Sequence, residues 1–198
     1  MSYTQLKADV ASWMHRPDLD GQMDTFTLLT EGVINKDLRV MEQETIFSFS
    51  FTDAFTDLPD DYLETRDLYI DASGSRCSIE NLTPKQLNTR YNSATGHVRA
   101  YSIHGGQIEM RPAPDPSDPT TGGWTYIARV PSLTANATND ILENYPLLYL
   151  SGMLTQACLY VQDEAETAKW GAIFDEQIRT ANKSAGDGRY TRPQVRIV

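Results

Sequence analysis

Residues 139–182, NDILENYPLLYLSGMLTQACLYVQDEAETAKWGAIFDEQIRTAN, decide the fold class of this 198-residue chain. Pro146 suits the first turn of a helix, because deeper inside it would remove a backbone hydrogen bond and clash with the preceding turn. The spacing after it predicts a long helix whose apolar face comprises Leu147, Leu150, Leu154, Ala157 or Cys158, and Val161. A second helix is predicted from about Glu164, with Trp170, Ile173 or Phe174, Ile178 and Ala181 buried. We expect these two helices to pair antiparallel.

Two more helices are predicted in residues 1–43. Over residues 3–15, apolar side chains recur at spacings of four and three, at Leu6, Val10 and Trp13. Ser2 or Thr4 can cap this helix. The next helix opens at Asp24 and extends to about Val40, with Phe26, Leu29 and Val33 on its apolar side.

Residues 44–133 change to the period of two that strands show. The run TIFSFSF (45–51) alternates three Phe with Ser48 and Ser50, which predicts a half-buried strand. In residues 98–111, two alternating runs flank Gly105-Gly106, a pair that suits a tight hairpin turn. GWTYIARV (123–130) alternates in the same way and follows a loop rich in Pro and Gly. The middle of the chain is therefore predicted to be an antiparallel sheet.

Two segments of this region are mixed in character. LPDDYLETRDLYI (58–70) is interpreted as a short helical turn at Pro59 followed by a strand. NLTPKQLNTRYNS (81–93) is interpreted as a short helix capped by Thr83, with Pro84 at its first position.

Helical periodicity is predicted to stop after Lys183. The remaining residues, 184–198, contain two Gly, one Pro and a closing Val-Arg-Ile-Val of strand propensity. This segment is either an arm that becomes ordered on a partner or a frayed end. The formal net charge is −10, and the residues from Lys183 onward carry +3, which leaves −13 for residues 1–182. An acidic body argues against a surface that grips nucleic-acid phosphates.

No catalytic residue, metal site or cofactor is predicted. His15, His97 and His104 lack the spacing of metal ligands, and no phosphate-binding or nucleophile motif is present. The acid pairs Asp60-Asp61 and Asp163-Glu164 are interpreted as residues that favour helix N-termini. Neither a signal peptide nor a membrane span is expected, because no stretch approaches the length of about 18 apolar residues.

Four segments resemble the head-to-tail adaptor (connector) family of tailed bacteriophages. They are LPDDYLETRDLYI (58–70), YSIHGGQIEMRPAP (101–114), WTYIARVPSL (124–133) and, above all, residues 139–182. The resemblance implies an α+β fold, mainly α, with an antiparallel four-helix bundle, an inserted β-sheet and hairpin subdomain, and an extended C-terminal arm. The expected parts are bundle helices in 1–43 and 134–183, the insertion in 44–133, and the arm in 184–198.

The resemblance also implies a structural, non-enzymatic role in the virion neck, after assembly in the host cytoplasm. Adaptors of this family form rings, commonly twelve-fold, that dock on the portal protein, surround the DNA channel without specific DNA binding, and receive downstream tail or nozzle proteins. Portal docking is thereby expected of Arg189, Tyr190, Arg192, Pro193, Val195 and Ile197. A contact with neighbours or with the next tail protein is expected of His104, Gly105 and Gly106.

Two alternatives remain open at this point. One is a neck, stopper or tail-completion protein at another layer of the tail, which would also be small and acidic. The other is a small β-rich hydrolase or carbohydrate-binding module that uses the aromatic sheet and the acid pairs.

Overall fold

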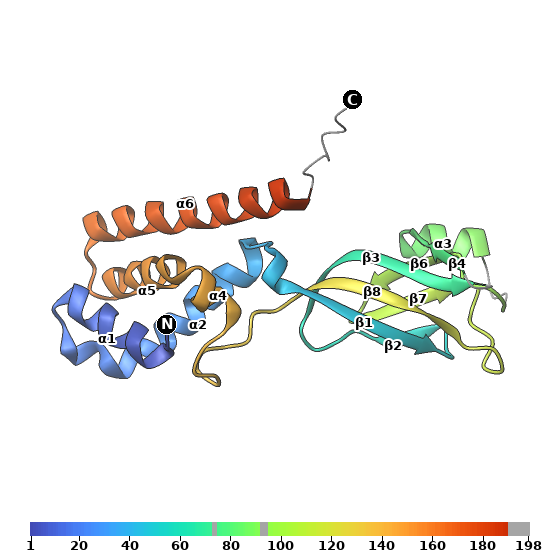
Figure 1. Ribbon diagram of the computed structural model, residues 1–198, viewed down its shortest axis with the longest axis horizontal. Helices are drawn as coiled ribbons and strands as arrows, with labels where there is room; N and C mark the ends of the chain where they lie inside the picture. The colour runs from blue at the N-terminus through green and yellow to red at the C-terminus, as the bar shows by residue number, and fades with distance from the viewer. Residues whose placement is uncertain (73–74, 92–94, 190–198) are drawn as a thin grey trace, which may run out of the picture. The chain divides into compact units, whose positions relative to one another are not determined.

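The computed structural model describes residues 1–72, 75–91 and 95–189, and the chain divides into two compact units (Figure 1). The helical unit consists of Met1–Gln43 and Arg129–Val198, and the β unit consists of Glu44–Ala128. Each unit has its own cluster of buried apolar side chains. The β unit is therefore an insertion between the N-terminal and C-terminal parts of the helical unit.

The helical unit is built around α5. Its elements are α1 (Tyr3–Met14), the 3₁₀ helices Pro17–Gln22 and Met41–Gln43, α2 (Met23–Asp37), α4 (Asp140–Asn144), α5 (Pro146–Tyr160) and α6 (Glu164–Arg189). Helices α1, α2 and α6 each pack against α5. Two sequence predictions are confirmed here: Ser2 caps α1 by accepting a hydrogen bond from the Gln5 backbone N–H at 3.2 Å, and Pro146 occupies the first turn of α5.

The α+β fold is confirmed, but the described residues show no clear four-helix bundle of the kind that the resemblance implies. A bundle needs helices that each bury one stripe, whereas α5 buries side chains around most of its circumference. Leu147, predicted to be buried, is 42% exposed, and Leu148 and Tyr149 are fully buried instead. Trp13, which the helical spacing placed with Leu6 and Val10 on the apolar side of α1, is 55% exposed.

Helix α6 continues beyond Lys183 to Arg189, so the predicted end of the helical periodicity is wrong. Apolar residues keep the helical spacing past that point, and Ala181 and Ala185 are both buried against the core of the helical unit. Packing of this face offsets the low helix propensity of Gly186 and Gly188. Residues 184–189 of the predicted extended arm are thus helical.

The β unit contains two four-stranded sheets. The first has the order β1-β8-β3-β4, with β1 (Glu44–Phe51), β8 (Thr120–Ala128), β3 (Tyr62–Ala72) and β4 (Ser75–Ser78). The second has the order β2-β7-β6-β5, with β2 (Phe55–Asp57), β7 (Gln107–Arg111), β6 (Ala100–His104) and β5 (Glu80–Asn81). All pairings are antiparallel except β5 with β6. Helix α3 (Pro84–Tyr91) begins at Pro84, as predicted.

The two sheets share one apolar core. Phe49, Leu68 and Trp124 from the first sheet pack in the same cluster as Tyr101 and Met110 from the second. The sequence predicted one sheet, because alternation along a strand does not show which strands pair. Pro59 lies in a turn before β3, closed by a hydrogen bond from the Tyr62 N–H to the Pro59 carbonyl oxygen at 2.9 Å, so the predicted helical turn there is wrong.

Strand β8 begins at Thr120, inside the predicted loop, and its two glycines lie within the strand. A Cβ atom at Gly122 would overlap the backbone carbonyl oxygen of Tyr69 and lie 2.7 Å from the Phe49 ring. Gly122 therefore permits the close approach of β8 to β3.

Tyr126 makes the stability of the β unit sensitive to alkaline pH. Burial raises the pKa of Tyr126 to about 12, and the hydrogen bond that its hydroxyl donates to Asp61 Oδ1 at 2.9 Å acts in the same direction. Because the folded protein holds this proton more tightly than the unfolded chain, the stabilisation is complete below the unfolded pKa and is lost as the pH rises toward 12. We expect wild-type stability, measured by urea unfolding, to fall between pH 10 and 12 more steeply than that of Tyr126→Phe. Parallel curves for the two proteins would contradict this expectation.

Candidate interaction surfaces

The tip of the β6–β7 hairpin carries the three predicted contact residues. His104 ends β6, and Gly105 and Gly106 form the turn with φ angles of 60° and 79°. Positive φ at both central residues is the geometry of the tight hairpin turns for which Gly is preferred. The structure thus confirms the predicted hairpin and brings the three residues together; their role in binding stays a prediction.

A charged and aromatic cluster supports this tip. Glu109 is 2% exposed and accepts a hydrogen bond from Arg111 Nε at 2.8 Å, while His104 Nε2 lies 3.4 Å from its other carboxylate oxygen. The Phe55 ring stacks on His104 and lies beneath the Arg111 guanidinium. We call Phe55, His104, Glu109 and Arg111 the tip cluster. Because Arg111 neutralises a buried carboxylate, the cluster holds the hairpin end in a defined shape.

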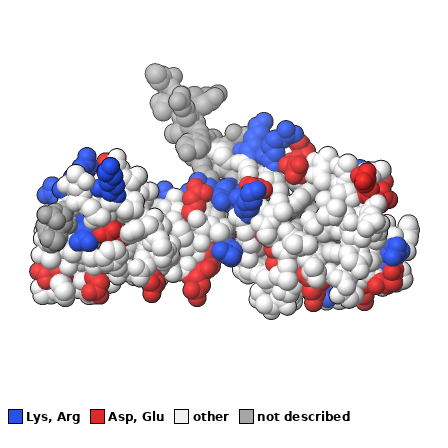
Figure 2. Space-filling view, turned by 180° about the vertical axis from the view of Figure 1, so that it is seen from behind, with Lys and Arg blue, Asp and Glu red and all other residues white. Residues whose placement is uncertain are grey.

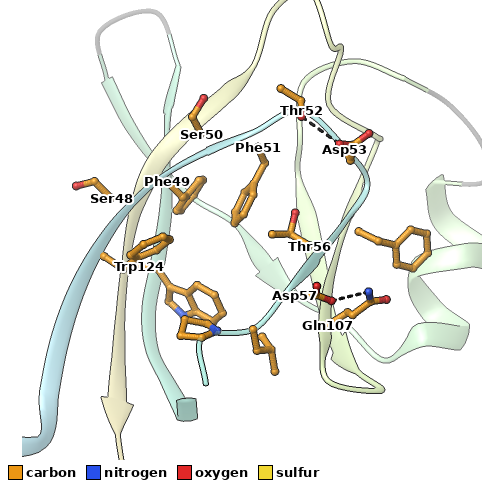
Figure 3. A pocket seen from close by; sticks show the side chains of 14 residues that line it. Ser48, Phe49, Ser50, Phe51, Thr52, Asp53, Thr56, Asp57, Gln107 and Trp124 are labelled. Atoms are coloured by element: carbon orange, nitrogen blue, oxygen red, sulfur yellow. Dashed lines mark hydrogen bonds between the residues drawn. The ribbon is translucent and has the colours of Figure 1, made fainter. Parts of the chain in front are cut away.

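A groove lies between β1 and β2, the edge strands of the two sheets, with a volume of about 650 Å³ (Figure 3). Phe49 and Phe51 stack with ring centres 4.3 Å apart and point into it, beside Trp124. Ser48 and Ser50 point the other way (Figure 3). The polar side chains that line the groove include Asp53 and Asp57, and Asp57 accepts a hydrogen bond from Gln107 Nε2 at 2.8 Å. The lining can hold apolar side chains and attract positive charge.

The last turns of α6 are fastened to the end of α2. The side-chain amide of Asn182 accepts a hydrogen bond from the Arg39 N–H at 2.7 Å and donates one to the Asp37 carbonyl oxygen at 2.8 Å. Ala185 is buried one turn further on. These contacts hold α6 against the helical unit near its C-terminal end, and the helix ends at Arg189.

The predicted portal-docking residues fall almost entirely beyond this position. Arg189 is the last residue of α6. Tyr190, Arg192, Pro193, Val195 and Ile197 lie outside the described residues.

One carboxylate of each acid pair accepts a structural hydrogen bond, and the two pairs lie in different units. Asp61 accepts the Tyr126 hydroxyl hydrogen bond in the β unit. Asp163 caps α6 in the helical unit by accepting a hydrogen bond from the Glu166 N–H at 3.1 Å. This agrees with the prediction that the Asp163-Glu164 pair lies at the N-terminus of a helix. Among the described residues, no group of three or more His, Cys, Asp and Glu side chains could hold a metal ion.

Sequence reasoning missed the groove and the tip cluster. The signal for the groove was the TIFSFSF run itself, which places three Phe on one side of a strand. Phe55 gave no comparable signal, because it meets Glu109 and Arg111 of β7 only when β2 pairs with that strand.

None of the helices in the described part of the chain combines the length and the apolar character that crossing a membrane requires. A search among curated proteins found no match for this sequence. The family model described as SU10 adaptor protein, by contrast, matches residues 1–197, which is nearly the whole chain. This match confirms the resemblance to phage adaptors that the sequence segments indicated. The chain therefore belongs to the SU10 adaptor protein family, a family of structural phage adaptors.

Proposed function

We propose that this chain assembles into a closed ring in the virion neck, docks on the portal protein through its C-terminal residues, extends the DNA channel and receives the tail proteins. The observation that carries the proposal is the family match over residues 1–197, since an adaptor must contact virion proteins on two sides. The twelve-fold stoichiometry is the expectation that the resemblance to head-to-tail adaptors provides. Assembly would begin in the host cytoplasm.

The C-terminal part of α6 supports the portal-docking step. Asn182 and Ala185 hold the helix against the helical unit up to its last turns, so the residues after Arg189 start from a rigid base. Those residues combine Arg192 and Arg196 with Val195 and Ile197, and a basic, apolar segment suits a cleft with apolar and acidic side chains. We infer that residues 190–198 are the portal anchor.

The charge of the chain supports passage of DNA without retention. Residues 1–182 carry −13, and a channel with net negative walls repels duplex phosphates. On the face seen in Figure 2, both basic and acidic side chains occur on each unit. That face therefore has no continuous acidic surface, and we propose that a different face lines the lumen.

A ring requires two different surfaces on each copy, joined head to tail. The exposed apolar side chains of the helical unit offer such surfaces on separate elements. Leu28 and Leu29 lie on α2, and Leu159 and Tyr160 lie at the end of α5, each more than half exposed. The hairpin tip with His104, Gly105 and Gly106 would contact a neighbouring copy or the next tail protein.

Removal of the C-terminal segment tests the portal-docking proposal. We expect the full chain to form a large complex with the portal ring of its phage, and a variant truncated after Arg189 to form none, because the anchor is missing. Light scattering and electron microscopy of the mixtures measure this outcome. Truncation after Arg189 rather than Lys183 keeps the buried Ala185 and the whole of α6.

Charge reversal in the intact chain provides the matched control. Arg192→Glu with Arg196→Glu should weaken the complex at least about tenfold, since like charges would then face the acidic side chains expected of the portal cleft. Lys85→Glu with Lys169→Glu makes the same change in net charge on α3 and α6, and should leave portal binding unchanged. Equal portal binding by the truncated and full chains would refute the anchor and favour a neck or tail-completion protein at another layer.

A further inference from the structure

Strand β1 is a long edge strand with an apolar surface. It pairs with β8 in register from Glu44 to Phe51, and it ends the sheet order β1-β8-β3-β4. Among the described residues, no strand pairs with its other side. Ile46 is 76% exposed and Phe47 44% exposed on this strand.

Edge strands of this kind are normally protected against pairing with other chains. Proteins place Lys or Pro on such edges, shorten them or bend them with bulges. Between Thr45 and Phe51, β1 has neither Lys nor Pro, and its pairing with β8 shows no register shift. Because β1 lacks these protective features, we expect its open edge to pair with another strand in the assembled state.

The groove beside β1 indicates which kind of strand would pair there. A strand added to β1 would direct every second side chain toward the sandwich interior, on the side where Phe47, Phe49 and Phe51 line the groove. Asp53 and Asp57 are the charged side chains of the lining, and no Lys or Arg belongs to it in the described part of the chain. Among the residues of an added strand that face it, the groove thus favours apolar side chains beside the Phe rings and basic side chains beside the two carboxylates.

We propose that the edge of β1 and its groove bind an extended segment of the tail protein that follows the adaptor, added to the sheet as a ninth strand of the β unit. The side chains of this segment that face the groove are apolar beside the Phe rings and Lys or Arg beside Asp53 and Asp57. The proposal rests on the proposed function and names the chemistry by which the β unit receives the tail.

The charge of the groove argues against a second copy of this chain as the occupant. Pairing β1 with β1 of another copy is a two-fold arrangement, which closes a pair and does not propagate around a ring. The sequence of β1, ETIFSFSF, also has no Lys or Arg that could face the Asp53 and Asp57 carboxylates. The basic segment that this chain itself has, residues 190–198, is already assigned to the portal.

Synthetic peptides test the proposal on the free full-length chain. The probe is a labelled peptide, the Val–Lys peptide, in which every second residue is Val in the middle and Lys toward both ends, with Thr between them, so that Val and Lys lie on one face. It is compared with a Val–Glu peptide, in which Glu replaces each Lys, and with a Val–Lys peptide interrupted by Pro. Fluorescence anisotropy should show the Val–Lys peptide binding about tenfold more tightly than the Val–Glu peptide, since exposed charge pairs each contribute modestly. The Pro peptide should not bind, because it lacks a backbone donor and the extended geometry.

Hydrogen exchange and point variants locate the binding site. Bound Val–Lys peptide should slow amide exchange in residues 44–51 and leave α1 and α2 unchanged. Asp53→Asn with Asp57→Asn should abolish the preference for Lys over Glu, and Phe47→Lys should weaken binding of the Val–Lys peptide at least about tenfold. Asp71→Asn with Asp175→Asn removes two exposed carboxylates elsewhere and should change neither result.

Three outcomes would overturn the proposal. Binding without slower exchange in residues 44–51 would place the peptide elsewhere. If amide exchange in β1 of the free chain becomes slower as the protein concentration rises, the occupant is a second copy of this chain. Slow exchange at every concentration would show that the chain covers its own edge. None of these measurements involves the portal, so the proposal can fail while the portal-docking function stands.

Discussion

Replacing Glu31 with Leu is expected to lower the free energy of unfolding of the helical unit by about 3 kcal/mol. Glu31 lies on α2 and is 4% exposed. Its carboxylate accepts hydrogen bonds from Ser132 Oγ at 2.7 Å, from the Leu133 N–H at 2.8 Å and from the Tyr149 hydroxyl at 3.4 Å. Leu fills a similar volume but accepts no hydrogen bond, so buried donors lose their partner.

The position of these donors makes the effect large. Ser132 and Leu133 belong to the segment that returns from the β unit to α4, and Leu133 is buried in the helical core. Tyr149 is completely buried in α5, and its burial raises the pKa of its hydroxyl well above the ordinary value. One side chain therefore joins α2, the returning segment and α5.

Urea unfolding followed by far-ultraviolet circular dichroism measures the loss. Glu31→Gln keeps an oxygen acceptor and should lose about half as much stability as Glu31→Leu. Glu176→Leu makes the same substitution at an exposed position of α6 and should shift stability by less than about 0.5 kcal/mol. A Glu31→Leu variant as stable as wild type would show that the returning segment is held by apolar packing alone.

The elements that sequence predicted well are those fixed by local chemistry. Pro146 can only begin a helix, Ser2 supplies an oxygen to cap one, and Gly105-Gly106 takes the two positive φ angles of a tight turn. Each of these constraints acts within a few residues of the chain. They hold whatever the rest of the molecule does, and the structure confirms all three.

The elements predicted poorly depend on residues distant in sequence. Helical spacing alone made Leu147 a core residue, but α5 is enclosed by three helices and presents Leu148 and Tyr149 to them instead. The end of α6 depends on Ala185 finding a place in a core formed by other helices. The four-helix bundle came from the family resemblance, and the central position of α5 departs from it.

The candidate surfaces divide in the same way. The hairpin tip at His104 could be predicted, since two glycines between alternating strands specify it. The groove needs β1 and β2 on the edges of two different sheets, which no period in the sequence reveals. The portal-docking role of the C-terminal residues came from the resemblance and remains a proposal.

Gly122→Val is expected to unfold the β unit and to leave the helical unit folded and able to bind the portal. A Cβ at this position meets the Tyr69 carbonyl oxygen, the Phe49 ring and, at 2.9 Å, the Ile70 Cα atom. Two of these three atoms are backbone of the neighbouring strand, so no rotamer change relieves the overlap. β8 must separate from β3, at a cost of about 4 kcal/mol or more, a large part of the stability of a small domain.

The independence of the two units follows from their separate cores. Trp124 and Tyr126 on β8 pack with residues of the β unit, whereas α6 and its Asn182 contacts lie within the helical unit. Hydrogen exchange should therefore become fast across residues 44–128 of Gly122→Val and remain slow in α5 and α6. Thr121→Val places the same Val side chain at the adjacent exposed position of β8, where it replaces only a hydroxyl with a methyl group, and should unfold neither unit. Loss of portal binding by Gly122→Val with α5 and α6 still protected would mean that the β unit takes part in docking, and that residues 190–198 are not a sufficient anchor.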